Sequence, residues 1–305
     1  MAPTVSFIIP FYGTSHSQRL ELAIESIFAQ KGVNIDLIVA GLSHATKIDN
    51  NEGLENYPKK EMPDIAKMGK VLNRGLSLAG GNFTYISDAD VLLYNRNYLS
   101  NLVQELLSQR KSLKRPPMRR LLLQDFEWFH QNVSLEGLEN SVSELDFSQD
   151  YIVKPKNSNR QIRIFPKFEN NRQKIFIASE LDFQDYISSK DNEGKEPAFF
   201  NQDRHCGTIF SLTEELLKIG GYHEGFISWG VWDADMQWKL ENQTGIRLIP
   251  PGKKFEVIHL DHQRGYFSKS KWEHDKILQG MRRSIGAEEC IKKDREDYLR
   301  GRNGR

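Results

Sequence analysis

The sequence contains little cysteine. Cys206 and Cys290 are its two cysteines, and they lie far apart in unlike contexts. They form neither a disulfide framework nor a CxxC metal site, and they suit a reducing cytosol. No apolar run approaches the roughly 18 residues needed to cross a bilayer, and no signal peptide precedes the first strand-like segment. We therefore expect a cytoplasmic chain with at most peripheral membrane contact.

The sequence also lacks an excess of charge of either sign. Lys and Arg number 42 against 41 Asp and Glu, so the formal net charge is +1. Dedicated nucleic-acid binders carry a strong basic excess, so we expect no nucleic-acid partner. Hydrophobic residues make up 38% of the 305 residues, which is enough to bury a core and excludes wholesale disorder.

Strand and helix patterns alternate over the first hundred residues. Segments 5–11 (VSFIIPF), 35–40 (IDLIVA) and 82–87 (NFTYIS) are rich in β-branched and aromatic residues. Between them, apolar residues recur at helical spacing over 20–28 and 64–79. Strand, helix, strand, helix, strand predicts βαβ units and therefore a parallel, Rossmann-like sheet of the α/β class.

The middle of the chain, 107–202, loses this rhythm. Short strand-like pieces occur at 161–165 and 174–178, separated by polar loops, and we interpret the region as an irregular and β-containing insertion beside the sheet. Its basic stretch around Pro116 and Pro117 is interpreted first as a solvated face. A patch for phosphate or an anionic acceptor is the alternative.

Regular patterns return after residue 203. A strand over 206–212 precedes a short helix for which Thr213 is the expected N-cap. A helix from Asp233 through Glu241, a strand over 255–260 and a helix to about 285 follow, the last opening with a capping box from Ser270 to Glu273. The charged tail, 287–305, is expected to fray.

Asp88-Ala89-Asp90 follows a predicted buried strand directly. Ligands of open α/β sheets bind at the carboxyl ends of the strands. Two carboxylates there could hold a hard divalent cation that bridges phosphate oxygens. An acidic turn without a metal is the alternative, because the pattern is short.

Two further pairs carry possible chemistry. His259 and His262 could share a metal if the chain turns between them, although exposed loop histidines are common. Asp233 and Asp235 begin a helix, whose amino-terminal dipole would keep them ionised, as a general base for a hydroxyl requires. A plain helix cap is the alternative reading of that pair.

The order of these segments resembles that of the inverting, family-two-like GT-A glycosyltransferases. Pro10-Phe11-Tyr12 after a strand, DAD, the block GGYHEGFISWGVWDADMQWKL and the H-x-x-H strand end carry the resemblance. The block is similar to the carboxyl-terminal domain of β-1,4-galactosyltransferases and chondroitin-polymerase-type enzymes. The resemblance covers roughly 4–105 and 203–285, and it implies a GT-A mixed sheet flanked by helices.

The resemblance also implies roles for individual residues. Asp233 matches the catalytic base, although Trp232 stands where the family has Glu. The implied ligands of Mn²⁺ (or Mg²⁺) are Asp90, His259 and His262. The implied nucleotide-sugar-binding residues are Pro10, Phe11, Tyr12, Arg74, Asp88, Ala89 and Trp229, and the implied acceptor-binding residues are Trp232 and Asp235.

The implied activity is metal-dependent, inverting transfer of a hexose from a UDP-sugar to a hydroxyl acceptor, such as a glycan, in polysaccharide biosynthesis. The implied division is a nucleotide-sugar-binding half (1–106), an acceptor-side insertion (107–202), an acceptor and catalytic half (203–286) and the charged tail. A non-catalytic carbohydrate- or nucleotide-sugar-binding module is the alternative. A sugar nucleotidyltransferase is less favoured, because no Gly-rich phosphate loop follows the first strand.

Overall fold

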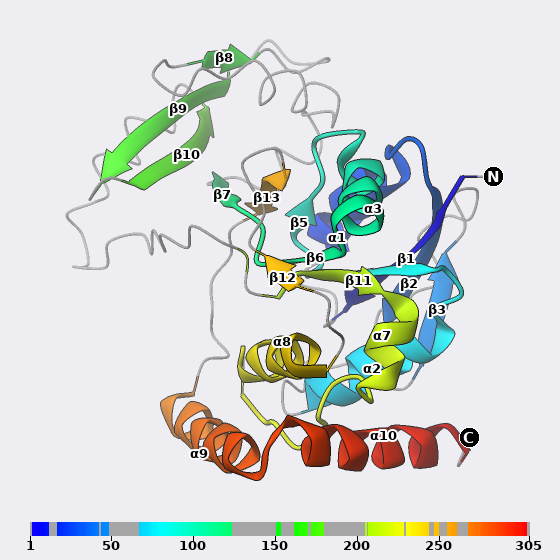
Figure 1. Ribbon diagram of the computed structural model, residues 1–305. Helices are drawn as coiled ribbons and strands as arrows, with labels where there is room; N and C mark the ends of the chain where they lie inside the picture. The colour runs from blue at the N-terminus through cyan, green and yellow to red at the C-terminus, as the bar shows by residue number, and fades with distance from the viewer. Residues whose placement is uncertain are drawn as a thin grey trace.

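The architecture is described from a computed structural model of the chain (Figure 1). It describes residues 2–11, 17–42, 44–48, 67–123, 151–153, 162–169, 172–179, 205, 207–228, 230–243, 247–249, 255–260 and 268–303.

The larger sheet contains seven strands: β1 (Thr4–Pro10), β2 (Asn34–Ala40), β3 (Ala45–Ile48), β4 (Phe83–Ile86), β6 (Lys111–Lys114), β11 (Ile209–Leu212) and β12 (Arg247–Ile249). Their order is β12-β6-β11-β4-β1-β2-β3. β1 pairs in parallel with β2 and β4, as βαβ units require, whereas β11 runs antiparallel to β4. The sheet is therefore mixed, and the predicted strands at 5–11, 35–40 and 82–87 are confirmed to within one residue at each end.

The second sheet contains six strands: β5 (Val91–Leu92), β7 (Met118–Leu123), β8 (Tyr151–Val153), β9 (Ile162–Glu169), β10 (Arg172–Ser179) and β13 (Val257–Leu260). Their order is β5-β13-β7-β10-β9-β8. β9 and β10 are the two strands expected at 161–165 and 174–178, and they pair antiparallel with each other. Because β10 also pairs with β7, and β7 with β13, the middle of the chain continues the sheet that contains His259.

Helices cover both faces of the larger sheet (Figure 1). They are α1 (Ser17–Phe28), α2 (Met68–Leu78), α3 (Tyr98–Gln109), α7 (Thr213–Lys218), α8 (Val231–Gln243), α9 (Lys269–Ile285) and α10 (Ala287–Asn303). α1 and α3 lie on one side, and α2, α7, α8 and α10 lie on the other. The expected α/β class, with a mixed sheet flanked by helices, is confirmed.

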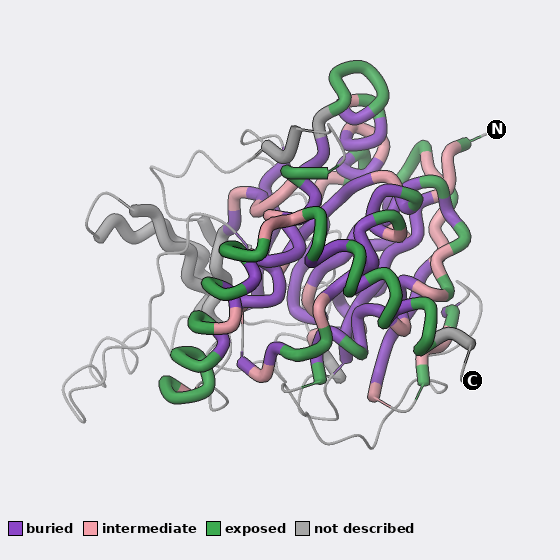
Figure 2. The backbone as a smooth tube through the Cα atoms, turned by 60° about the horizontal axis from the view of Figure 1, so that its bottom comes forward, coloured by how far each residue is buried: buried purple, intermediate pink, exposed green. Residues whose placement is uncertain are grey.

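Two hydrophobic clusters occupy the two faces of the sheet. Side chains alternate along a strand, so in β1 Val5, Phe7 and Ile9 join the cluster under α1 and α3, while Ile8 joins the one under α2, α7 and α8. Figure 2 shows that the buried residues gather in the interior, whereas the exposed residues lie on the outer turns of the surface helices. This packing fixes the strand ends that carry the site.

Two predicted helix caps are wrong. Thr213 is the first residue of α7 rather than its N-cap, because its hydroxyl bonds the main-chain oxygen of Gly81 at 2.6 Å and the hydroxyl of Thr84 at 2.8 Å. α9 begins earlier than the capping box implied. Ser268, in extended conformation, takes the N-cap position without a side-chain hydrogen bond, so Ser270 lies within the helix.

The expectation that the tail frays is also wrong. Residues 287–303 form α10, which packs against α8, α9 and α7. It buries a narrow stripe of Cys290, Ile291, Asp294 and Tyr298. The sequence pattern predicts a solvated tail because a carboxylate, Asp294, lies at the centre of this stripe. An apolar residue there would have indicated a buried helix face. Among the described residues, no helix is both long and apolar enough to cross a membrane.

Candidate functional site

Asp90, His205 and His259 converge from three separate parts of the chain. Asp90 lies in the turn between β4 and β5, and its main-chain oxygen accepts a bond of 2.8 Å from Leu260 in β13. β13 pairs with β5, with His259 opposite Val91. His205 precedes β11, which pairs with β4. Each of the three side chains offers one ligand atom, and these three atoms all lie within 4.8 Å of one another.

This cluster has the chemistry of a divalent-cation site. All three side chains are buried, the rings of His205 and His259 have centroids 5.8 Å apart, and His259 Nε2 lies 3.5 Å from Asp90 Oδ2. Two imidazoles and one carboxylate form a mixed donor set that suits a first-row transition metal. A buried cluster of such donors, contributed by different elements, fits a metal, which would offset the charge of Asp90.

His205 is a ligand candidate that the sequence pattern does not predict. Its Nδ1 lies 2.7 Å from Thr208 Oγ1, and its Nε2 lies 3.1 Å from Asp88 Oδ2. Thr208 in turn contacts Ser87 at the end of β4 through a 3.1 Å hydroxyl pair. Such partners orient an imidazole toward a metal. The available signal was a histidine just before a strand, but only the pairing of β11 with β4 brings it beside the DAD turn.

Asp88 lies at the partly open side of the cluster. Its side chain is 28% exposed, whereas Asp90 is buried. Gly207 lies against it, because a Cβ there would stand 3.0 Å from Asp88 Oδ2 and 3.3 Å from His205 Cε1. The two acids of the DAD turn therefore have different surroundings: Asp90 is buried beside His259, whereas the more exposed Asp88 contacts His205.

Asp233 lies in the first turn of α8 and is only 8% exposed. Burial raises its pKa well above the usual value, the charge of Asp88 raises it further, and Arg115 opposes both. Burial and a like charge thus outweigh the helix dipole in setting the direction of this pKa shift. Tyr222 lies in the same electrostatic environment: burial and the charges of Asp233 and Asp88 raise the pKa of its phenol.

Pro10 and Phe11 lie at the same edge of the sheet as the DAD turn, whose middle residue is Ala89. Pro10 ends β1, and the main-chain N–H of Phe11 donates to Ala40 at the end of β2. The main chain of Ser87 likewise bonds Ile8. Because β1, β2 and β4 are parallel, their carboxyl ends form one edge of the sheet. Phe11 and Ala89 are buried at this edge.

Three expected site residues make contacts inside the protein. The guanidinium of Arg74 donates to the main-chain oxygens of Gly41 and Leu42, at the end of β2. Trp232 is 4% exposed and belongs to the hydrophobic cluster under α2, α7 and α8, so it is not displayed to an acceptor. Asp235 is fully buried, and both of its carboxylate oxygens accept bonds from Arg282.

Tyr12, Trp229 and His262 lie outside the described residues. Their expected roles therefore stay predictions.

Comparisons with known proteins return matches at the level of solved structures. No known protein family matches the sequence, and no curated protein does. Mannosyltransferase PcManGT from Pyrobaculum calidifontis, in complex with GDP-Man and Mn²⁺, is 16% identical with a TM-score of 0.47. The match covers 93% of this chain and 65% of that one, so this chain spans less than two thirds of its length.

Two other solved structures show a similar degree of likeness. The catalytic domain of Drosophila β1,4-galactosyltransferase 7, in complex with xylobiose, is 11% identical with a TM-score of 0.43, over 90% of this chain and 79% of that one. S. aureus TarS 1-349 in complex with UDP is 13% identical with a TM-score of 0.47, over 91% and 64%. PcManGT and β1,4-galactosyltransferase 7 are glycosyltransferases by name, and each of the three matches has a TM-score below 0.5. The assignment of individual residues rests on the geometry described above.

Proposed function

We propose that this chain is a metal-dependent, inverting glycosyltransferase that moves a sugar from a UDP-sugar to a hydroxyl acceptor. The observation that carries the proposal is one constellation at the carboxyl edge of the sheet. A buried cluster of Asp90, His205 and His259 can hold a divalent cation, and Asp233, a carboxylate with a raised pKa, lies within electrostatic reach of the neighbouring Asp88. The segments that resemble GT-A glycosyltransferases supply these residues.

The donor set favours Mn²⁺. Mg²⁺ prefers oxygen ligands and retains several waters, whereas two of the three donors here are imidazole nitrogens. Asp90, His205 and His259 would hold the ion, and His262 is the further candidate from the sequence. A cation bound there supplies positive charge that neutralises the diphosphate leaving group.

Asp233 is the proposed general base. Burial and the charge of Asp88 raise its pKa, and a carboxylate with a raised pKa is a stronger base than an ordinary one. The acceptor hydroxyl gives its proton to Asp233 while its oxygen forms a bond to the anomeric carbon. The bond from that carbon to the diphosphate oxygen breaks on the opposite face, so configuration inverts and UDP leaves with the bonding electron pair.

The remaining residues bind and orient the substrates. The sheet edge formed by Pro10, Phe11 and Ala89 is the proposed wall for the nucleotide, with Tyr12 continuing it. Asp88, the more exposed acid of the DAD turn, is the proposed contact for the ribose and diphosphate of the donor. The acceptor side is assigned to residues 203–286, with Trp229 as the proposed wall of the sugar site and 107–202 as its elaboration. Trp232 and Asp235 are left out of the acceptor site because Trp232 packs in a hydrophobic cluster and Asp235 forms an ion pair with Arg282.

A donor screen tests the proposal. The chain is incubated with Mn²⁺ and, in turn, UDP-glucose, UDP-galactose, UDP-N-acetylglucosamine and GDP-mannose, with and without p-nitrophenyl glycosides as acceptors. Acceptor-dependent release of UDP, abolished by EDTA and restored by Mn²⁺, is the expected result. Binding of UDP and Mn²⁺ with no release from any donor would overturn the proposal and identify a non-catalytic nucleotide-sugar-binding module.

A further inference from the structure

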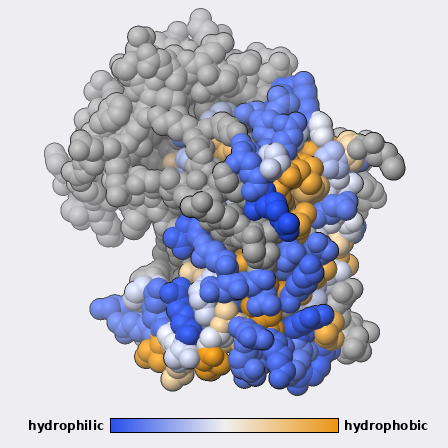
Figure 3. All heavy atoms as spheres, viewed as in Figure 1, coloured by the Kyte–Doolittle hydropathy of each residue, from blue (hydrophilic) through white to orange (hydrophobic). Residues whose placement is uncertain are grey.

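The buried face of α9 is polar rather than apolar. Its buried residues are Asp275, Gln279 and Arg282, at the i, i+4, i+7 spacing of one helix face. Ile277, Met281 and Ile285 are instead 62%, 58% and 61% exposed, and apolar residues gather on the surface over this helix in Figure 3. Surface helices normally bury their apolar side. Because buried charges contribute little net stability, a gain in stability does not explain the polar buried face of α9.

Asp275 binds the main chain of the loop that leads to α8. Its fully buried carboxylate accepts bonds from the N–H of Ile227, at 2.9 Å to Oδ2, and of Ser228, at 2.5 Å. Ser228 directly precedes Trp229, the residue proposed to line the sugar site. A carboxylate that accepts two backbone N–H bonds fixes the direction of the chain there.

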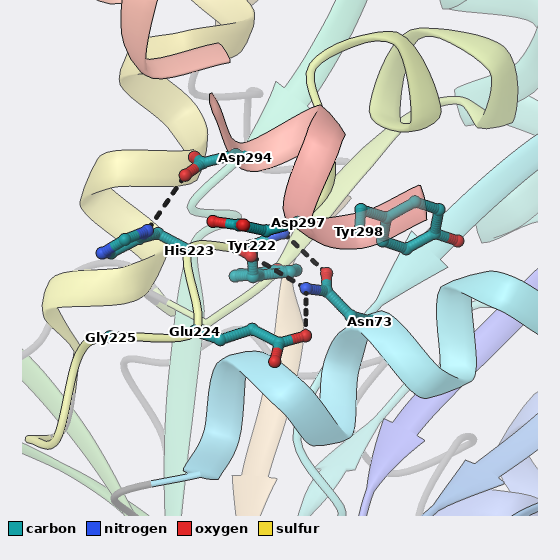
Figure 4. Close-up of a pocket in the computed structure, with 8 residues that line it drawn as sticks. All are labelled: Asn73, Tyr222, His223, Glu224, Gly225, Asp294, Asp297 and Tyr298. Atoms are coloured by element: carbon teal, nitrogen blue, oxygen red, sulfur yellow. Dashed lines mark hydrogen bonds and ion pairs between the residues drawn. The ribbon is translucent and has the colours of Figure 1, made fainter. Parts of the chain in front are cut away.

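Asn73 of α2 holds the beginning of the same loop. Its side-chain amide donates to the main-chain oxygen of Tyr222 at 2.8 Å, and its oxygen accepts from the N–H of Tyr222 at 2.7 Å. The amide also donates to Glu224 at 3.0 Å. Figure 4 shows these contacts, in which Asn73 points from α2 toward the loop. The loop 222–228 is therefore held at one end from α2 and at the other from α9.

Arg282, two turns further along α9, holds the helix of Asp233. Its guanidinium donates to both oxygens of Asp235, at 2.9 and 3.0 Å, and to both oxygens of Asp294 in α10, at 3.1 and 2.6 Å. Lys239 of α8 also binds Asp294, at 2.7 Å. Two carboxylates and two cations thus form a buried, charge-balanced network. Asp235 lies only two residues beyond Asp233.

We propose that Asp275 and Arg282 are positioning residues for sugar transfer. Asp275 sets the path of the acceptor-side loop, and Arg282 sets the place of the helix end that carries Asp233, so that α9 fixes the distance between acceptor and base. This inference rests on the proposed function for its catalytic consequence. Its structural part, the ordering of the loop by Asp275, is measurable without any substrate.

The experiment compares Asp275→Ala with wild type in two measurements. Hydrogen exchange at the amides of Ile227 and Ser228 should be at least about 10-fold faster in the variant, because both N–H groups lose their acceptor. KM for the p-nitrophenyl glycoside that wild type uses should rise about 10-fold or more, since small displacements of a positioning contact have large kinetic effects. The Kd for UDP with Mn²⁺, measured by titration calorimetry, should stay within about twofold.

Two substitutions make the result specific. Glu273→Ala removes an exposed carboxylate from the same helix and should change neither measurement. Asp275→Asn retains one oxygen acceptor and should give intermediate values, and it serves as the test variant if Asp275→Ala does not fold. Arg282→Lys keeps the charge but loses the two-pronged geometry, so kcat should fall about 10-fold at unchanged UDP affinity.

Unchanged exchange at Ile227 and Ser228, or an unchanged KM for the acceptor, would overturn the inference. So would a parallel loss of acceptor and UDP affinity, which indicates general destabilisation. The proposed function fails separately: if wild type releases no UDP from any donor, or Asp233→Asn transfers sugar normally, that proposal is wrong. The exchange measurement still reports on Asp275 in that case.

Discussion

The imidazoles of His205 and His259 lie side by side, with ring centroids 5.8 Å apart, although the two residues are far apart in the sequence. β11 and β13 pair with the strands on either side of the DAD turn, β4 and β5, and so bring the two rings to Asp90. Strand pairing therefore brings the three candidate metal ligands together. Each of these ligands can be removed by a single substitution.

Removing a donor should remove Mn²⁺ binding. His205→Ala and Asp90→Ala should each weaken Mn²⁺ affinity about 100-fold or more, and Thr208→Val, which removes the hydroxyl beside His205 Nδ1, about 10-fold. Titration calorimetry with Mn²⁺ alone measures these affinities. His44→Ala, at an exposed histidine, is the control. Wild-type affinity in His205→Ala would exclude this histidine from the site.

Asp233→Asn should separate chemistry from binding. The amide keeps the shape of the side chain but cannot take the proton of the acceptor, so transfer should fall roughly 10²–10⁴-fold. The Kd for UDP with Mn²⁺ should hardly change. Steady-state transfer and calorimetry test this together, with Glu241→Gln on the exposed side of α8 as the control. A silent Asp233→Asn would leave Asp233 as a residue of the first turn of α8 with no part in catalysis.

The pH dependence of kcat/KM should show the raised pKa of Asp233. The base must be ionised, so the rate should be low at acidic pH and rise as pH passes through that pKa. Since burial and Asp88 raise it, this rise should occur well above the value of about 3.9 for an ordinary Asp. Because kcat/KM reports on the free enzyme, it is the appropriate measurement. A rate already at its plateau at pH 4.5 would contradict the assignment.

The local elements of the fold could be predicted from the sequence. In β1, β2 and β4 the apolar runs are short and bounded by turn residues, and in α1 and α2 the apolar spacing is that of a helix. Asp90 and His259 stood out because each lies at the end of such a segment. These signals are local, and they depend on no contact between distant parts of the chain.

The residues that were missed depend on distant contacts. His205 becomes a ligand candidate only when β11 pairs with β4. Asp235 has the same local sequence signature as Asp233, and its ion pair with Arg282 decides that it is internal. Likewise α10 is held by Asp294, whose buried partners come from α8 and α9. No periodicity in the sequence reports such a polar core.

Asp294 should stabilise the fold in a pH-dependent way. Burial alone would raise its pKa, but the hydrogen bond with His223 and the charges of Lys239 and Arg282 outweigh burial and lower it. A lowered pKa means that the stabilisation is present above the unfolded value of about 3.9 and is lost as pH falls through the folded value. Asp294→Asn should therefore have a lower Tm than wild type at pH 7, and the difference should shrink between pH 4 and pH 2. A constant difference over that range would contradict the predicted linkage.

Gly207→Ala should damage the site without damaging the fold. The added methyl would stand 3.0 Å from Asp88 Oδ2 and 3.3 Å from both Asp88 Oδ1 and His205 Cε1, so the acid and the histidine must move apart. Because the three nearest atoms belong to side chains, Tm should change little. UDP affinity in the presence of Mn²⁺ should nevertheless fall about 10-fold, as for a loss of ligand orientation.

The matched control is Gly280→Ala in α9, where no atom lies within 4 Å of the added methyl and a helical alanine should stabilise by up to about 1 kcal/mol. Equal UDP affinity in the two variants would show that the contact between Asp88 and His205 does not matter for donor binding, and it would move the donor away from this side of the cluster.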